Sequence, residues 1–189
     1  HSVRDAAVDV ELIAKLKKNN ATAIATLTRE QSTFIYAIVP PWFDDPFFQR
    51  GVEPQTIATL RSAAYRNKVG NDPDFAKNKA AFEMASDNLR KLYQAGVRIG
   101  FGTDTGPPAR FLGFFEHWEM ELMVQAGLPP MAVIQSASKN AAEFLGVTRD
   151  FGTLEKGKRA DLIVLDKDPL DDIRNTRTIH SVYLGGEKL

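Results

Sequence analysis

Residues 97–106 constrain the fold of this chain more than any other stretch. A short run of β-branched and aromatic residues ends there abruptly in Gly-Thr-Asp-Thr-Gly. This pattern is typical of a buried strand that delivers one carboxylate, Asp104, to the rim of a sheet or barrel. Aspartate and glycine are also ordinary turn formers, so this stretch taken alone leaves a simple turn as an equal alternative.

The segments before this stretch alternate between helical and extended patterns. A one-sided apolar pattern predicts a helix over 8–20, and the uncharged, β-branched run 21–28 predicts a buried strand. Two more helices are expected at about 54–67 and 74–95, the second ending directly before the strand that leads to Asp104. Two successive helix-to-strand steps indicate an α/β fold with parallel strands.

Residues 29–53 are irregular and rich in aromatic residues and proline. They predict a long connection with some helical turns, of the kind that often covers a site. An equally acceptable interpretation is that these aromatic residues pack as a lid without contacting a ligand, because aromatic residues dominate cores and interfaces alike.

The character of the chain changes near residue 150. Between Asp104 and that point, the pattern predicts helices over 113–126 and 130–145, each followed by glycine. Beyond it, the sequence is rich in turns and predicts strands at 160–166 and from 179 onward. A small β-rich segment therefore follows the α/β part.

Composition excludes several classes of function. Lysine and arginine together number 24, as do aspartate and glutamate, and no basic stripe is present, so nucleic acid is not an expected partner. No apolar run approaches the roughly 20 residues that span a bilayer, and no targeting segment is recognisable, so no membrane partner is expected and localisation stays open. Because cysteine is absent, any metal must be held by His, Asp or Glu.

Four motifs follow one another in a specific order. They are Gly-Thr-Asp at 102–104, His-Trp-Glu-Met-Glu-Leu-Met-Val-Gln-Ala-Gly-Leu at 117–128, Asn-Ala-Ala-Glu-Phe-Leu-Gly at 140–146, and Gly-x-Leu-x-x-Gly-x-x-Ala-Asp-Leu-x-Val-Leu-Asp at 152–166. The first is weak alone, but the ordered set resembles the amidohydrolase superfamily. The resemblance is to its metal-dependent hydrolases similar to imidazolonepropionase and Xaa-Pro dipeptidase.

The resemblance implies a partial (β/α)8 TIM barrel. Residues 1–146 would supply strands 6 to 8 with their helices, and residues 147–189 would enter the β-sandwich that the family builds from both chain ends. The chain then looks like roughly the C-terminal 40 to 50% of such an enzyme, since about three of eight strands are present.

The resemblance also implies two metal ligands. Asp104 matches the aspartate of strand 8, which would bind metal and act as the proton-shuttling base, and His1 matches the histidine of strand 6. The family uses one or two Zn²⁺ ions, together with a His-x-His pair, often a lysine, and a further histidine, none of which has a counterpart here. We therefore expect weak or absent metal binding and an inactive, truncated piece of a hydrolase that acts on C–N bonds.

The implied substrate is a small amide or a dipeptide-like molecule. Arg110 could hold a substrate carboxylate, and His117, on the helix after strand 8, could face the substrate. A histidine that is simply satisfied on its helix is the more ordinary interpretation of His117. His180 is expected to be structural, since no second ligand lies near it in the sequence.

Other catalytic classes find little support, because the chain lacks a nucleotide-binding glycine loop and a Gly-x-Ser-x-Gly nucleophile elbow. An alternative from another class is a non-catalytic partial barrel whose exposed strand edges pair with another copy. Either interpretation predicts a homo-oligomer.

Overall fold

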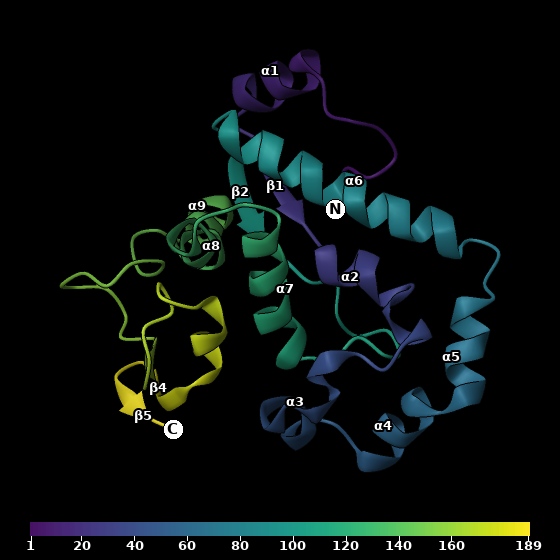
Figure 1. Ribbon diagram of the computed structural model, residues 1–189. Helices are drawn as coiled ribbons and strands as arrows, with labels where there is room; N and C mark the ends of the chain where they lie inside the picture. Colours follow the sequence, from purple (N-terminus) through teal and green to yellow (C-terminus); the bar gives the residue numbers. More distant parts are fainter.

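Two short parallel strands form the centre of the fold, which the computed structural model describes over residues 1–189 (Figure 1). Strand β1 (Thr22–Ala25) pairs with β2 (Arg98–Phe101) in parallel, so that Ala25 lies opposite Phe101 at their carboxyl ends. The two strands approach so closely that a Cβ on Gly100 would lie 2.8 Å from a methyl carbon of Thr22. Glycine is therefore required at this point of the strand.

Helices surround this strand pair. The helices of the first half are α1 (Val10–Lys18), α2 (Leu27–Ser32), α3 (Pro46–Arg50), α4 (Pro54–Arg61), α5 (Ala63–Gly70) and α6 (Phe75–Gln94), with 3₁₀ turns η1 (Ile35–Ala37) and η2 (Pro41–Asp44). After β2 come α7 (Phe114–Gln125), α8 (Pro130–Ala137) and α9 (Lys139–Leu145). None of these helices is long and apolar enough to span a bilayer.

The core is divided into an aliphatic and an aromatic cluster. The aliphatic cluster joins β1 and β2 to helices α6, α7 and α8; among its buried members are Leu27, Leu89, Leu92, Ile99, Leu122, Met123 and Val133. The aromatic cluster joins the segment between α2 and α5 to the start of α7; its buried members are Tyr36, Trp42, Phe43, Phe48, Leu60, Phe114 and Phe115. Helix α7 contributes to both clusters and so connects the strand pair to the aromatic segment.

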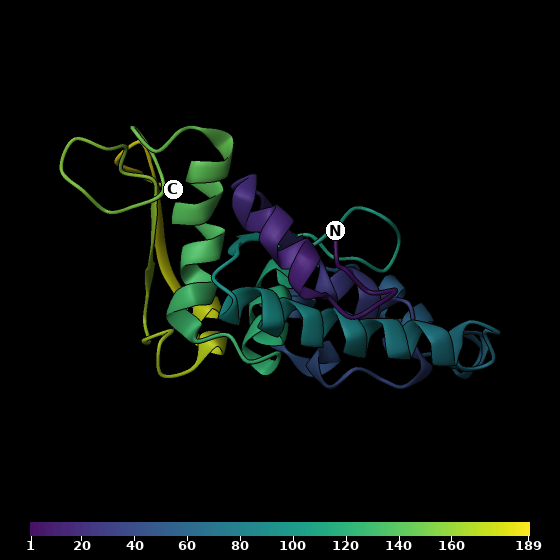
Figure 2. The same cartoon turned by 90° about the horizontal axis from the view of Figure 1, so that it is seen from above.

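The last part of the chain forms a separate antiparallel sheet. Strands β3 (Leu162–Leu165), β4 (Ile179–Leu184) and β5 (Glu187–Lys188) are hydrogen-bonded in that order, with the 3₁₀ helix η3 (Ile173–Arg177) before β4. Figure 2 shows this sheet at one end of the molecule, beside α8 and α9 and far from α5. The mixed α/β class and the β-rich final segment agree with the sequence prediction, while the division at residue 146 stays a prediction.

The predicted strand 21–28 was too long. Only residues 22–25 are extended, and a helix, α2, already begins at Leu27. The reason lies far along the chain, because the Glu119 carboxylate accepts hydrogen bonds from the backbone N–H groups of Leu27 and Thr28. Those N–H groups are unpaired at the first turn of any helix, so a buried carboxylate there stabilises a helical start that β-branched residues alone would not predict.

Two predicted helices are each broken in two. The helix predicted over 54–67 is split at Ser62, whose hydroxyl accepts from the Tyr65 N–H and so begins α5. The helix predicted over 130–145 is split at Ser138, where φ is −125° and ψ is −83°. Serine competes with the helical backbone for hydrogen bonds, and this explains the break at Ser62 most directly.

Candidate functional site

The carboxyl ends of β1 and β2 bring two polar segments side by side. Residues 26–28 continue from β1 and residues 102–105 continue from β2, and the Thr28 hydroxyl donates to the Thr103 carbonyl at 3.2 Å. Gly102 is needed at this crossing, since a Cβ there would lie 2.9 Å from a methyl carbon of Ile24. The residue that follows Thr103 is Asp104, which the strand therefore carries to the rim, as the sequence predicted.

Asp104 lies between two guanidinium groups. Its Oδ2 is 3.0 Å from Arg110 Nη1 and 3.8 Å from Arg29 Nε, and 37% of its side chain is exposed. Its backbone is left-handed, with φ at +54°, a conformation that aspartate tolerates better than most residues. The side chain thus occupies a partly open, positively charged position at the end of the strand.

Arg110 is fixed from three directions. Besides the Asp104 carboxylate, it donates to the Asp104 carbonyl at 3.2 Å and to the Ser32 hydroxyl at 3.1 Å. The sequence interpretation was that Arg110 could hold a substrate carboxylate. In the structure its partner is Asp104, so a substrate anion would have to share or replace that contact.

Two buried carboxylates, Glu119 and Glu30, lie next to the strand ends that carry Asp104. Glu119 is fully buried and accepts from the N–H groups of Leu27 and Thr28 at 2.9 and 2.7 Å and from the Thr28 hydroxyl at 2.8 Å. Burial raises the pKa of Glu119 to about 7, against the opposing effect of these three hydrogen bonds. Glu30 is also buried and is paired with Arg4 and Arg29.

The first residues of the chain lie along β1. The Ser2 hydroxyl accepts from the Thr26 N–H at 3.2 Å, and His1 lines a small cavity together with Ala23 and Ile24. Asn88 of α6 fixes the segment by donating to the carbonyls of Val3 and Ala6 and accepting from the Val8 N–H; these contacts measure 2.8, 2.8 and 2.9 Å. His1 is thus placed beside the strand that precedes β2, while its own side chain is exposed.

His117 belongs to a different environment. Its Nδ1 is 2.9 Å from the Thr176 hydroxyl of η3, and its ring packs edge-on against Phe47. Burial, with the nearby Arg177 charge, lowers the pKa of His117 to about 4. The structure therefore joins Asp104 to Arg110, as a single site would require, but places His117 against η3. The one side-chain hydrogen bond of His180 is to its neighbour Ser181, at 3.2 Å.

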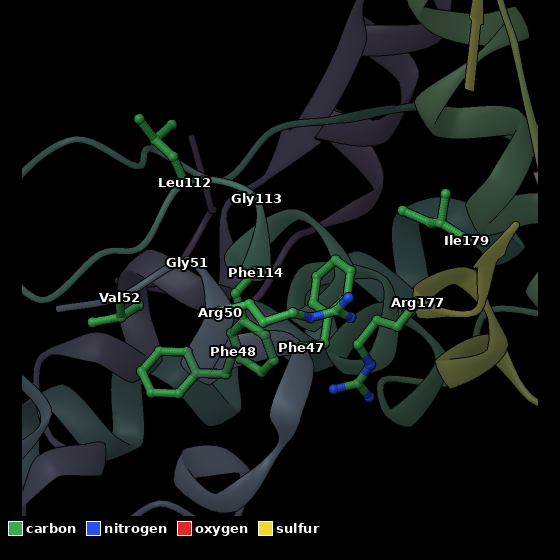
Figure 3. Close-up of a pocket in the computed structure, with 10 residues that line it drawn as sticks. All are labelled: Phe47, Phe48, Arg50, Gly51, Val52, Leu112, Gly113, Phe114, Arg177 and Ile179. Carbon is green, nitrogen blue, oxygen red and sulfur yellow. The ribbon is translucent and has the colours of Figure 1, made fainter. Parts of the chain in front are cut away.

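A larger cavity lies between α3, the start of α7 and η3 (Figure 3). Its volume is about 440 Å³, and Phe47, Phe48 and Phe114 form much of its wall. Arg177 also lines it, but the two carboxylates of Asp45 and Glu121 already pair with that guanidinium. The cavity wall is therefore mostly apolar, its charged groups are the guanidiniums of Arg50 and Arg177, and no carboxylate or imidazole lines it.

A family model described as the amidohydrolase family matches residues 24–189. The chain belongs to the amidohydrolase family. By family it is accordingly an enzyme of the hydrolase type. The match begins within β1 and includes Asp104, α7, α9 and the C-terminal sheet, which together carry the four sequence motifs.

Named relatives agree with this membership. Ochratoxinase from Aspergillus niger is 32% identical over 117 residues, which cover 57% of this amidohydrolase chain and 23% of the relative. A 5-methylthioadenosine/S-adenosylhomocysteine deaminase from Bacillus cereus is 30% identical over 114 residues, covering 53% of the chain and 25% of the relative. The chain thus spans about a quarter of the length of these curated relatives.

Solved structures show the same relationship. A Xaa-Pro dipeptidase with bound methionine in its active site superposes with a TM-score of 0.66 at 25% identity, covering 96% of this chain and 37% of that one. Ochratoxinase from A. niger superposes with a TM-score of 0.63 at 22% identity, covering 98% and 35%. The second likeness concerns the fold alone.

Amidohydrolases are generally metal-dependent, so we tested whether these residues fit a metal. No group of three or more His, Cys, Asp or Glu side chains is arranged to hold an ion. Asp104 is engaged by two arginines, and His1 is not among its partners. The residues of this chain alone therefore do not fit a metal ion, since a stable site needs several donors around one point.

Several residues around the strand ends were not predicted from the sequence. Arg29 and Glu30 fall within residues 29–53, which were predicted to be an irregular connection, and Asn88 was not singled out within the helix predicted over 74–95. A signal existed for Asn88, because it lies among Ala85, Leu89 and Leu92 on the buried face of α6. For Arg29 no local signal existed, because its position depends on the helix that Glu119 starts.

Proposed function

We propose that this chain is the part of a metal-dependent amidohydrolase that carries the last strands of a (β/α)8 barrel. In this proposal β1 and β2 are strands 7 and 8, the segment at His1 follows strand 6, and residues 147–189 belong to the β-sandwich. The observation that carries it is Asp104, at the carboxyl end of a parallel strand, where (β/α)8 enzymes place their catalytic groups.

The proposed reaction is hydrolysis of a C–N bond in a small amide or a dipeptide-like substrate. A partly exposed carboxylate in the position of Asp104 can take a proton from an attacking water and pass it to the departing nitrogen. Arg110 and the neighbouring Arg29 support a preference for substrates with a carboxylate, because guanidinium groups bind that group with two parallel hydrogen bonds. The proposal gives His117 no direct part, since its hydrogen bond to Thr176 directs it toward η3.

The proposed metal ligands in this chain are His1 and Asp104. They are two donors of a set whose other members would have to come from residues outside 1–189, in keeping with the coverage of 37% of the dipeptidase. Zn²⁺ is the proposed ion because imidazole and carboxylate donors suit it. Alone, the chain is expected to be inactive.

The coding sequence upstream of His1 tests this proposal. We expect it to contain a His-x-His pair, then a lysine and then a histidine, each after a predicted strand. With that upstream part included, Asp104→Asn should lower the hydrolysis of N-acyl amino acids by about 10²- to 10⁴-fold. The exposed Asp5→Asn change is the matched control and should leave the rate unchanged. An upstream sequence without these ligands, or an active Asp104→Asn variant, would contradict the proposal.

A second candidate is a non-catalytic, self-associating module. The observation that favours it is the exposure of apolar residues on the final sheet, where Ile163 is 56% exposed and Leu184 is 54% exposed. Such surfaces commonly mark contacts between chains. We predict self-association in either case, so a monodisperse monomer in light scattering would contradict both.

A further inference from the structure

The loop that carries Asp104 is bound by one carboxylate of α7. Glu116 Oε1 accepts from the Thr103 hydroxyl at 3.1 Å and from the Thr105 hydroxyl at 3.2 Å, and those residues are the two neighbours of Asp104. Glu116 Oε2 accepts from the Gly113 N–H at 2.7 Å. One side chain therefore connects both flanks of Asp104 to the first turn of α7.

Asp104 needs such support because its backbone conformation is uncommon. A φ of +54° is costly for a residue with a Cβ, and it persists only where the surroundings hold it. Within residues 102–113 the backbone itself makes only two bonds, from Gly106 N to Arg110 O at 3.5 Å and from Arg110 N to Pro107 O at 3.1 Å. Neither of them restrains the peptide groups next to Asp104, so these groups are held by side chains, and the Thr28 hydroxyl and Arg110 donate to the carbonyls of Thr103 and Asp104.

From these contacts we infer that Glu116 is a positioning residue for Asp104. It acts through the hydroxyls of Thr103 and Thr105 and orders the backbone that carries Asp104, while Arg110 and Arg29 contact the carboxylate itself. The inference rests on the proposed function, in that positioning matters for catalysis only if Asp104 is a catalytic group. The geometric claim, that Glu116 orders Asp104, can be measured without any activity.

A helix cap alone does not account for these contacts. A glutamate at the third helical position often accepts from the backbone N–H that precedes the helix, and Oε2 of Glu116 does this at Gly113. The other oxygen, Oε1, takes no part in the cap and accepts hydrogen bonds from the two threonine hydroxyls. Removing one threonine hydroxyl therefore separates the two roles, because the cap stays intact while the connection to the loop is weakened.

The sequence offers a selective probe of Asp104. Threonine is followed by aspartate only at residues 103–104, so cell-free synthesis with carbonyl-¹³C threonine and ¹⁵N aspartate yields a single doubly labelled peptide group. Relaxation of its ¹⁵N gives the backbone order parameter of Asp104, which is about 0.85 in a rigid backbone and below about 0.6 in a flexible one. Unlike a chemical shift, this quantity does not change merely because a neighbouring residue is replaced.

Three variants complete the experiment. Glu116→Ala should lower the order parameter of Asp104 below about 0.6, and Thr105→Val, which keeps the shape of the side chain, should lower it in the same direction. Glu83→Ala on the exposed face of α6 is the matched control and should leave it near about 0.85. Thermal unfolding followed by circular dichroism establishes that each variant is folded. If Glu116→Ala does not fold, the order parameter of Asp104 in Thr105→Val tests the inference.

The inference is overturned if Asp104 stays rigid in Glu116→Ala. It is equally overturned if Asp104 stays rigid in Thr105→Val, because the Thr105 hydroxyl would then contribute nothing to the positioning through which Glu116 is inferred to act. The failure of the proposed function would look different. In that case the order parameters would change as expected, but the upstream sequence would lack metal ligands or Asp104→Asn would remain active.

Discussion

Helix α7 carries two buried carboxylates that are two residues apart and are satisfied in opposite ways. Glu119 faces the strand ends and is held by two backbone N–H groups and one hydroxyl, with no cation in contact. Glu121 faces the C-terminal segment and is paired with Arg177, which also pairs with Asp45. Residues two apart lie on opposite sides of a helix, so one helix serves both regions.

The difference between these regions shows what each must accomplish. Neutral donors around Glu119 fix the start of α2 and, through the Thr28 hydroxyl, the carbonyl of Thr103. These donors fix the position of the backbone beside Asp104 without placing another cation near its carboxylate. The ion pairs of Arg177 join segments that are distant in sequence, because they connect η3 to α7 and to the start of α3. We expect the stability of the region around Glu119 to depend on its hydrogen bonds, and the stability of the region around Arg177 to depend on its ion pairs.

The largest effect should follow the removal of Arg177. Its side chain is 11% exposed, and Arg177→Met would leave the Glu121 and Asp45 carboxylates without a cation. Breaking a buried pair on one side costs about 3 to 5 kcal/mol. Urea unfolding of the variant and of wild type measures this loss. A loss below about 1 kcal/mol, the level of exposed ion pairs, would show that the pair is effectively exposed.

Glu119→Ala should cost somewhat less, about 2 to 3 kcal/mol, because it leaves the N–H groups of Leu27 and Thr28 unpaired in a buried place. Glu119→Gln retains one acceptor oxygen and is the matched control, for which a smaller loss is expected. Urea unfolding measures both. If alanine were no worse than glutamine, the carboxylate would not be needed to start α2.

His117 should make the junction with η3 sensitive to acid. The unfolded chain binds a proton at His117 below about pH 6.5, whereas the folded chain stays neutral there to about pH 4, so stability falls as the pH falls through this window. His117→Gln removes the difference and should gain about 1 kcal/mol relative to wild type at pH 4.5, allowing for partial exposure. Urea unfolding at pH 7 and pH 4.5 tests this. Parallel losses in the two proteins would contradict it.

The smallest effect on stability should come from the exposed face of the final sheet. Ile163→Lys is expected to change the free energy of unfolding by less than about 0.5 kcal/mol, since the side chain is 56% exposed. If this face joins two copies, the same change should shift the protein toward monomer in sedimentation velocity. An unchanged sedimentation coefficient in an associating protein would place the contact elsewhere.

Local patterns predicted the parts of the fold that depend on neighbouring residues. The strand before Asp104, helix α6 and the β-rich end follow from periodicity and glycine signals, and the order of motifs indicated the family. The start of α2 at Leu27 could not be predicted, because it depends on Glu119, which lies 92 residues away in the sequence. The position of Arg29 near Asp104 depends on where α2 begins, so it could not be predicted from the sequence either.

The sequence named two residues of the candidate site, Asp104 and Arg110, whose roles stay predictions. Asp104 lies where the sequence placed it, and Arg110 lies beside it. The roles of Glu116 and Glu119 were not predicted, although both residues lie within the helix predicted over 113–126. Their roles depend on which face of α7 meets the loop, and the hydrophobic pattern of that helix does not reveal this because it is apolar on several sides.

A zinc titration tests the central claim most directly. We propose that Asp104 is a metal-ligand position whose partners are mostly missing from residues 1–189. Isothermal titration calorimetry of Zn²⁺ into the chain, with Asp104→Asn as the control, should show weak or absent binding that is the same for both proteins. A one-to-one isotherm of submicromolar affinity that is lost in Asp104→Asn would contradict the account, because the chain would then hold a complete metal site.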